Sequence, residues 1–337
     1  MADILVLMTI AFQEELLERI KALSPRLKLV VDTVRSEEDF SEDLLAEVEV
    51  LYTASVLPDP EDTPNLKWVQ VHFAGVDHLA DHPLLQSEVR VTTLSGVAAS
   101  GMTEFAVMMM LSLGRRLPLM MEDKSAKLWA EDRFERFKPV QLRGSTVGIV
   151  GYGSIGRQIA RICRSFGAEV LATKRDLKKL EDPGFQFDDL GDADSSLLRR
   201  LYPPQALASM AAECDFLIIT IPLTSETRGT VDEKIFERMK PSSFLIDLSR
   251  GGIVDHGALV DALRDKRIAG AALDVYPVEP LPESSPLWEM GNVILSPHVA
   301  GSSARYNEMA IELFAENMQR YLADQPLLNR FIAERGY

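Results

Sequence analysis

The chain has 337 residues, of which 46% are hydrophobic and 26% charged, a composition that suits a globular protein of about two domains. Its formal net charge of −15 disfavours nucleic acid and anionic membrane surfaces, so we expect neither as a partner. Two cysteines are too few for a disulfide framework or a zinc cluster, so we expect reduced thiols and a cytoplasmic location.

The first hundred residues alternate short apolar runs with amphipathic segments. The apolar runs predict strands at Ile4–Met8, Lys28–Val31, Val50–Thr53, Trp68–Val71 and Val89–Leu94. Between them, Phe12–Leu23 and Ser36–Ala46 predict helices, the second with Ser36 as its cap. Strands separated by helices indicate βαβ units, so we expect a parallel sheet.

A Met-rich apolar helix over Gly101–Arg116 is predicted to leave this first domain. Residues 117–143 are charged and carry the exposed-looking Trp129. We therefore expect a surface excursion there, at the contact between the subunits of a homodimer.

A second alternating region starts at Ser145. It predicts six strands, at Thr146–Val150, Glu169–Thr173, Phe216–Ile221, Phe244–Leu248, Gly270–Val275 and Val293–Leu295. Six parallel strands with helices between them are the doubly wound arrangement that binds dinucleotides. The turn-rich stretch 181–204 does not fit this pattern and predicts a surface insertion.

The segment GYGSIG at 151–156 joins a predicted strand to a predicted helix, which is the setting of a dinucleotide-binding loop. In such a loop Gly151 allows the tight turn, Gly153 lets the backbone approach a pyrophosphate, and Gly156 lets helix and strand pack closely. The helix N-terminus adds N–H groups and positive partial charge. The alternative is an ordinary glycine-rich turn, which the flanking strand and helix disfavour.

The residues after the second strand of this domain bear on the choice of dinucleotide. NAD enzymes place an acidic residue there for the ribose 2′-hydroxyl. Here Thr173 is followed by Lys174 and Arg175, and two cations suit the 2′-phosphate of NADP. We therefore expect NADP or NAD and favour NADP. In the alternative, the two cations are solvated and Asp176 binds the ribose.

Three charged residues follow predicted strands of the second domain. Arg250, Glu279 and His298 should lie at the carboxyl edge of the sheet, where ligands bind in open α/β folds. An imidazolium can protonate the alkoxide formed from a ketone, a neighbouring carboxylate orients it, and a guanidinium can bind a carboxylate in a fork. Ordinary surface residues are the alternative for each side chain taken alone.

Three histidines, His72, His78 and His82, gather in the first domain, and the last two have the i, i+4 spacing of a helix. The segment lacks the glutamate of an H-E-x-x-H zinc motif, so we predict no metal site. One of the three could contact substrate.

Four motifs resemble, in order, those of the D-isomer-specific 2-hydroxyacid dehydrogenases. They are GYGSIG at 151–156, DLSRGGIVD at 247–255, GAALDVYPVEPL at 270–281 and SPHVAG at 296–301. The likeness covers nearly the whole chain, and several motifs that agree in order are far more specific than any one of them.

The resemblance implies roles for the matching residues. His298 is then the acid/base, Glu279 its partner and Arg250 the substrate anchor. The implied cofactor-binding residues are Gly151, Gly153, Ser154, Ile155, Gly156, Thr173, Lys174, Arg175, Pro222, Thr227, Ser249, Arg250, Asp274, His298, Gly301 and Thr103, with Asp274 holding the nicotinamide carboxamide. The substrate would contact the backbone N–H groups of Gly75 and Val76 together with Arg250 and His298.

The implied fold is α/β, with a Rossmann-type doubly wound NAD(P)-binding domain over 100–302 and a flavodoxin-like substrate domain. That second domain is discontinuous and consists of 1–99 with 303–337, because the last helix, at 302–323, returns to it. The implied activity interconverts a 2-oxo acid and its D-2-hydroxy acid, as glyoxylate/hydroxypyruvate reductases do.

Two departures and two alternatives qualify the resemblance. Lys174 stands where the family usually has an acid, and Glu279 stands where formate dehydrogenases have glutamine, which disfavours that branch. A dinucleotide-sensing corepressor-like protein of the same fold can keep the same three charged residues. A different dinucleotide enzyme is the other alternative, and a turnover assay with 2-oxo acids separates all of these.

Overall fold

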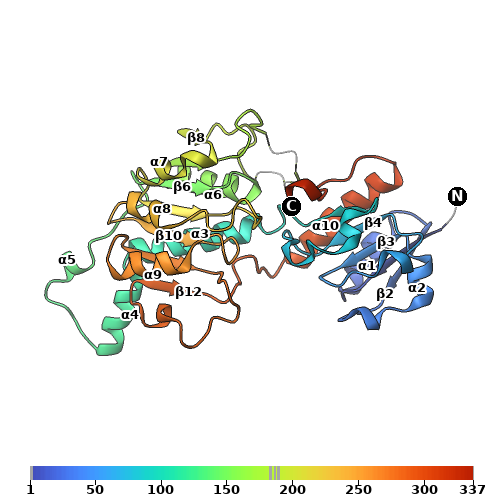
Figure 1. Ribbon diagram of the computed structural model, residues 1–337, viewed down its shortest axis with the longest axis horizontal. Helices are drawn as coiled ribbons and strands as arrows, with labels where there is room; N and C mark the ends of the chain where they lie inside the picture. The colour runs from blue at the N-terminus through green and yellow to red at the C-terminus, as the bar shows by residue number, and fades with distance from the viewer. Residues whose placement is uncertain (1–2, 182–183, 186, 188–189, 337) are drawn as a thin grey trace. The chain divides into compact units, whose positions relative to one another are not determined.

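A computed structural model describes residues 3–181, 184–185, 187 and 190–336. The chain divides into two compact units (Figure 1). The first consists of residues 1–98, 184–186 and 303–337, and the second of residues 99–183 and 187–302. The predicted domains differ from these units at residue 99 and in the short stretch 184–186.

The first unit is built on a five-stranded parallel sheet with the order β2-β1-β3-β4-β5. Its strands are β1 (Ile4–Met8), β2 (Leu27–Val31), β3 (Val50–Thr53), β4 (Trp68–Val71) and β5 (Arg90–Thr92). This is the strand order of flavodoxin-like folds. All five strands lie where the apolar runs predicted them.

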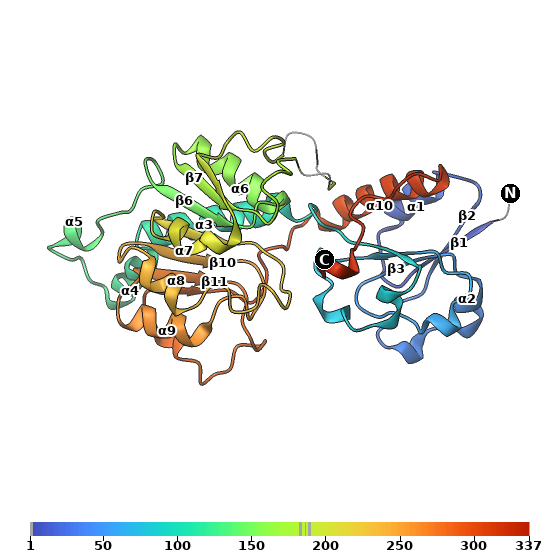
Figure 2. The same cartoon turned by 45° about the horizontal axis from the view of Figure 1, so that its top comes forward.

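Helices α1 (Glu14–Lys21) and α10 (Tyr306–Leu322) lie side by side over one face of this sheet (Figure 2). The opposite face is covered by short 3₁₀ turns and by α2 (Glu42–Glu47). Ser36 caps a helical turn at Glu37–Asp39, as predicted, but this turn is separate from α2, so the prediction of one continuous helix over Ser36–Ala46 was wrong. The Asp39 carboxylate accepts the Arg35 and Ser36 N–H groups at 2.8 and 2.9 Å and so closes that turn early.

The second unit contains a seven-stranded parallel sheet with the order β12-β11-β10-β9-β6-β7-β8. Six strands were predicted: β6 (Thr146–Val150), β7 (Glu169–Thr173), β9 (Phe216–Ile219), β10 (Phe244–Asp247), β11 (Gly270–Leu273) and β12 (Val293–Leu295). The seventh strand, β8 (Arg200–Tyr202), was not predicted. It lies within 181–204, so the prediction that this stretch is only a surface insertion was wrong. It is a three-residue edge strand that pairs with β7 and ends before two prolines, so it carries almost no periodicity.

One face of this sheet packs against α3 (Ala99–Gly114) and α6 (Ser154–Ser165). The other packs against α7 (Leu207–Ala211), α8 (Glu233–Arg238) and α9 (His256–Arg264) (Figure 2). The surface segment predicted at 117–143 contains the helices α4 (Leu117–Ala126) and α5 (Arg133–Arg136).

Cys163 and Cys214 are unpaired, and each is buried in the core on a different face of this second sheet. In the part of the chain that the structure describes, no helix has the length and apolar character needed to cross a membrane.

Candidate active site

The carboxyl edge of the second sheet collects most of the predicted site residues of that unit. Because β6, β10, β11 and β12 are parallel, the segments that follow them leave the sheet at the same edge. These segments carry the glycine-rich loop, Arg250, Asp274 and His298.

The structure brings His298 and Glu279 together as a hydrogen-bonded pair, with 2.8 Å between Nδ1 and Oε2. Their side chains are 43% and 36% exposed, so the pair is accessible to a ligand. The other carboxylate oxygen of Glu279 accepts the Tyr276 N–H at 2.9 Å. Glu279 is therefore fixed by the backbone and fixes Nδ1 in turn, which leaves Nε2 as the ring nitrogen for proton transfer to a ligand.

Asp274 holds the turn that carries His298. Its Oδ1 accepts the Ser296 hydroxyl at 2.7 Å and the Val299 N–H at 2.9 Å, and its Oδ2 accepts the Ala300 N–H at 2.8 Å. His298 has a φ of +54°, in the left-handed region that few residues adopt. The three hydrogen bonds stabilise this unusual conformation. A contact of Asp274 with nicotinamide stays a prediction.

Two residues that hold this turn, Ser296 and Tyr276, were not identified from the sequence. The Tyr276 hydroxyl donates to the Ser296 carbonyl at 2.9 Å and accepts the Ser296 N–H at 3.2 Å. A tyrosine that follows a buried strand needs a hydrogen-bond partner for its hydroxyl. This requirement is the feature of the sequence that could have identified Tyr276.

Arg250 follows β10 in a turn fixed by Asp247. The Asp247 Oδ1 accepts the Ser249 N–H at 3.1 Å and the Ser249 hydroxyl at 2.5 Å. Burial raises the pKa of Asp247 to about 7. A Cβ on Gly251 would lie 1.9 Å from the Tyr276 carbonyl oxygen, so the segment carrying Arg250 runs directly against the segment that leads to Glu279.

The glycine-rich loop has the geometry that a dinucleotide requires. Gly151 has a φ of +102°, and a Cβ on Gly156 would lie 2.2 Å from the Gly151 carbonyl oxygen, so both positions need glycine. A Cβ on Gly153 would meet nothing within 4 Å, which leaves open space above the loop. Since α6 begins at Ser154, its first N–H groups face the same space, and the residues present fit a bound pyrophosphate.

Two threonines support this loop from neighbouring strands. The Thr173 hydroxyl accepts the Gly151 N–H at 3.2 Å, and the Thr220 hydroxyl donates to the Gly151 carbonyl at 3.0 Å. Thr173 is only 3% exposed, so its hydroxyl serves the loop.

The charged residues after β7 lie at the surface. Lys174 Nζ donates to the Glu181 carbonyl at 3.4 Å, and Arg175 lies 3.4 Å from the Glu226 carboxylate. The Asp176 Oδ1 accepts the Lys178 N–H at 3.0 Å. The Asp176 carboxylate therefore accepts a hydrogen bond from within its own turn.

The other predicted contacts are distributed over both units. The Thr227 hydroxyl donates to the Pro222 carbonyl at 2.7 Å and so closes the loop after β9. Thr103 is buried in α3, where its hydroxyl donates to the Ala99 carbonyl at 2.7 Å. Gly75 and Val76 belong to the first unit, where they follow β4.

The histidines of the first unit have local partners. His72 Nδ1 lies 2.8 Å from the Tyr52 hydroxyl, and burial lowers the pKa of His72 to about 4. His82 Nδ1 accepts the Leu84 N–H at 3.2 Å. Among the described residues, no group of three His, Cys, Asp or Glu side chains is arranged to hold a metal ion.

The chain is similar to a known family and to several named relatives. Residues 107–300 match the family model for the NAD-binding domain of D-isomer-specific 2-hydroxyacid dehydrogenases. The glyoxylate reductase/hydroxypyruvate reductase of Mus musculus is 34% identical over 259 residues, which cover 75% of this chain and 73% of the mouse protein. The glyoxylate reductase of Thermofilum pendens is 32% identical over 265 residues, covering 76% of this chain and 71% of that protein.

A solved structure gives the same result. The D-isomer-specific 2-hydroxyacid dehydrogenase of Xanthobacter autotrophicus, crystallised with NADPH and MES, superposes with a TM-score of 0.80 at 27% identity over the full length of both chains. The predicted resemblance and fold class are confirmed. Neither the family description nor these relatives support the corepressor alternative.

Proposed function

Because the chain belongs to the D-isomer-specific 2-hydroxyacid dehydrogenases, we propose that it reduces a small 2-oxo acid to the D-2-hydroxy acid in an NADPH-dependent reaction. The observation that carries this proposal is the exposed His298–Glu279 pair, held at 2.8 Å on the strand edge that also bears the glycine-rich loop. An acid/base residue and a dinucleotide loop at one edge are the two components that such a reduction requires.

Different residues at this edge have different roles in the proposed reaction. When bound, the reduced nicotinamide supplies a hydride to C2 of the oxo acid. His298 donates a proton to the oxygen on C2, where negative charge develops, and Glu279 keeps the ring oriented and stabilises its charged form. In the reverse direction, His298 accepts the hydroxyl proton.

Arg250 is the proposed substrate anchor. A guanidinium can bind the carboxylate of the 2-oxo acid through two parallel hydrogen bonds and can polarise the neighbouring carbonyl. Its backbone is set by the Asp247–Ser249 turn, so the side chain leaves the sheet at a defined point. Contacts of substrate with Gly75 and Val76 stay a prediction.

The cofactor contacts follow from the loop and from the residues around it. Gly151, Gly153 and Gly156 with the first N–H groups of α6 would hold the pyrophosphate. Lys174 and Arg175 would bind a 2′-phosphate, and the engagement of Asp176 in its own turn supports NADP over NAD.

Relatives indicate the substrate class. The Mus musculus relative is named for glyoxylate and hydroxypyruvate, and the Thermofilum pendens relative for glyoxylate, so these two acids are the first candidates. The test is a turnover assay with both acids and with larger 2-oxo acids, each with NADPH and NADH. We expect turnover of at least one acid, faster with NADPH. Glycolate formed from glyoxylate has no stereocentre, so the D configuration is checked by chiral analysis of the product from hydroxypyruvate or a larger 2-oxo acid. Tight NADPH binding without turnover of any 2-oxo acid would contradict the proposal.

We also propose a homodimer formed by the excursion 117–143. Its side chains include large apolar groups in solvent, with Trp129 84% and Phe134 79% exposed. Burying them against a second copy removes this apolar surface from water. Light scattering should give twice the chain mass, and Trp129→Glu should shift it toward the monomer.

The two unpaired, buried cysteines support a cytoplasmic location.

A further inference from the structure

Helix α6, which begins at the glycine-rich loop, carries two polar side chains that are almost completely buried. Arg157 is 0% exposed and Gln158 is 6% exposed. Burying a guanidinium is unfavourable unless hydrogen-bond partners replace its water. The hydrogen-bond partners of these two side chains must therefore come from another part of the chain.

The segment between β7 and β8 supplies those groups. Arg157 Nη1 donates to the Asp192 carbonyl, and Nη2 donates to the Leu180 carbonyl. The Gln158 side-chain carbonyl accepts the Gly191 N–H at 2.7 Å. These hydrogen bonds attach Leu180, Gly191 and Asp192 to the first turn of α6.

The same segment also reaches the loop itself through Tyr152, the residue between the first two glycines of the motif. The Tyr152 hydroxyl donates to Asp192 Oδ2 at 2.5 Å, and its ring lies 4.8 Å from the Arg157 guanidinium. Tyr152 is 2% exposed. The Asp192 carboxylate also accepts the Ser196 N–H at 3.1 Å and the Leu197 N–H at 3.2 Å, so it is rigidly held.

We propose that the segment 191–197 is a brace for the dinucleotide loop and that Asp192 is a positioning residue for cofactor binding. The brace is bonded to Tyr152 at the start of the loop and to Arg157 just after it, so it fixes both ends of the backbone that would receive the pyrophosphate. A loop that is already ordered loses less conformational entropy when a ligand binds. The inference rests on the proposed function, because it assumes that this loop binds a dinucleotide.

The test compares Tyr152→Phe and Asp192→Ala with a matched control. Tyr202→Phe removes the same kind of bond, since the buried Tyr202 hydroxyl donates to the Glu213 carboxylate at 2.5 Å on the other face of the sheet. The dissociation constant of NADPH is measured by fluorescence titration without substrate, at a temperature where each variant is fully folded. The Michaelis constant and turnover number follow on the same proteins.

We expect Tyr152→Phe and Asp192→Ala each to weaken NADPH binding about five- to twenty-fold, with turnover at saturating NADPH within about two-fold of wild type. Adding Tyr152→Phe to Asp192→Ala should cause little further loss, because the hydroxyl acts through that carboxylate. Tyr202→Phe should leave NADPH binding unchanged.

Equal NADPH affinity in wild type, Tyr152→Phe and Asp192→Ala would overturn the brace while leaving the proposed function intact. An equal loss of affinity in Tyr202→Phe would also overturn it, because the effect would then reflect general destabilisation. A wild-type protein that binds neither NADPH nor NADH would overturn the proposed function, and the brace with it.

Discussion

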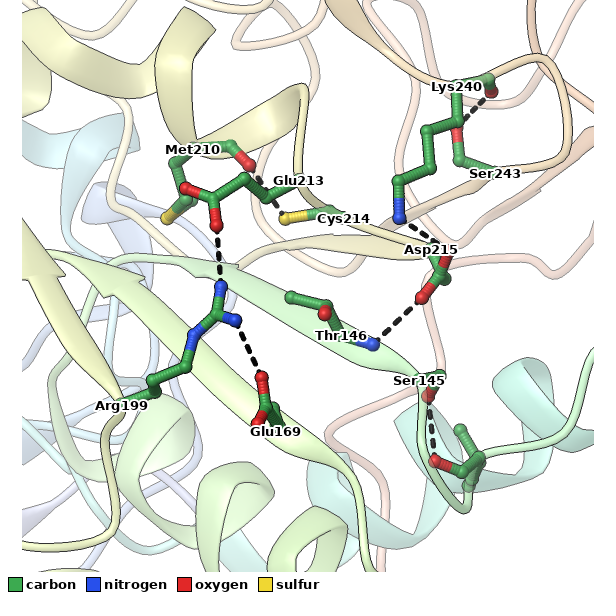
Figure 3. A network of polar contacts seen from close by, with 11 residues as sticks. Ser145, Thr146, Glu169, Arg199, Met210, Glu213, Cys214, Asp215, Lys240 and Ser243 are labelled. Atoms are coloured by element: carbon green, nitrogen blue, oxygen red, sulfur yellow. Dashed lines mark hydrogen bonds and ion pairs between the residues drawn. The ribbon is translucent and has the colours of Figure 1, made fainter.

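The two edges of the seven-stranded sheet use the same residue types in opposite ways. At the amino edge, charged side chains pair with one another: Arg199 bridges Glu169 and Glu213 at 2.6 Å each, and Lys240 lies 2.8 Å from Asp215 (Figure 3). These contacts link the starts of neighbouring strands to the turns that enter them.

At the carboxyl edge, the carboxylates accept mainly from the backbone. Asp247 and Asp274 accept N–H groups of the turns that carry Arg250 and His298, and Glu279 accepts one while it holds the histidine. At the carboxyl edge, the acidic side chains hold the turns that carry Arg250 and His298. At the amino edge, the acidic side chains form ion pairs with neighbouring lysine and arginine side chains. Substitutions at the two edges should therefore have different consequences.

The largest expected effect is that of His298→Gln at the carboxyl edge. Loss of the general acid should reduce turnover by ~10²–10⁴-fold, while NADPH affinity stays within about two-fold of wild type. Steady-state kinetics and a fluorescence titration of NADPH on the same preparation measure both. Near-normal turnover would remove His298 from the mechanism.

Arg250→Ala should follow, with kcat/KM reduced by about 10²–10³-fold through both a higher KM and a lower kcat. The same guanidinium would bind the carboxylate and polarise the carbonyl. Arg250→Lys should not restore activity, because an ammonium cannot form the two-pronged contact. Full activity of the lysine variant would show that charge alone matters there.

A smaller effect is expected for the pair Lys174→Asp with Arg175→Pro. The wild type should prefer NADPH by about 5- to 150-fold, less at high salt, and the double variant should prefer NADH. The ratio of kcat/KM for the two cofactors at two ionic strengths measures this. If the wild type prefers NADH at both, then Asp176 or another group serves the ribose and the NADP assignment fails.

The smallest effect should come from the amino edge. Asp215→Asn weakens the pair with Lys240 and the bond from the Thr146 N–H, at 2.8 Å. Because this pair is partly exposed, we expect about 1 kcal/mol less stability to urea and an unchanged kcat. A tenfold loss of kcat in a folded Asp215→Asn protein would contradict the distinction between the edges.

The parts of the fold with strong periodicity could be predicted from the sequence. In the part of the chain that the structure describes, eleven of the twelve strands lie at or near apolar runs, since buried parallel strands need such runs. The strand β8 was missed because an edge strand of three residues between turns carries almost no pattern. The separation of the Ser36-capped turn from α2 was missed because it depends on one side chain, that of Asp39, closing its own backbone.

For the site, motif order predicted Arg250, Glu279 and His298, and the structure pairs the last two. The contacts of Asp192 were not predictable, because its partners Tyr152 and Arg157 lie 40 and 35 residues away and no motif marks it. Long-range polar contacts of this kind depend on the path of a loop, which residue spacing does not define.

The two buried cysteines have a practical consequence. Burial raises the pKa of both the Cys163 and the Cys214 thiol to about 12, so neither forms the thiolate that reacts with maleimides at neutral pH. The chain contains no other cysteine. A cysteine introduced at an exposed position of each unit, for instance at Glu47 and at Lys234, would therefore be labelled selectively without first removing the native thiols. Fluorescence transfer between two such dyes would then report, in solution and molecule by molecule, whether the distance between the dyes changes when a dinucleotide or an oxo acid is added.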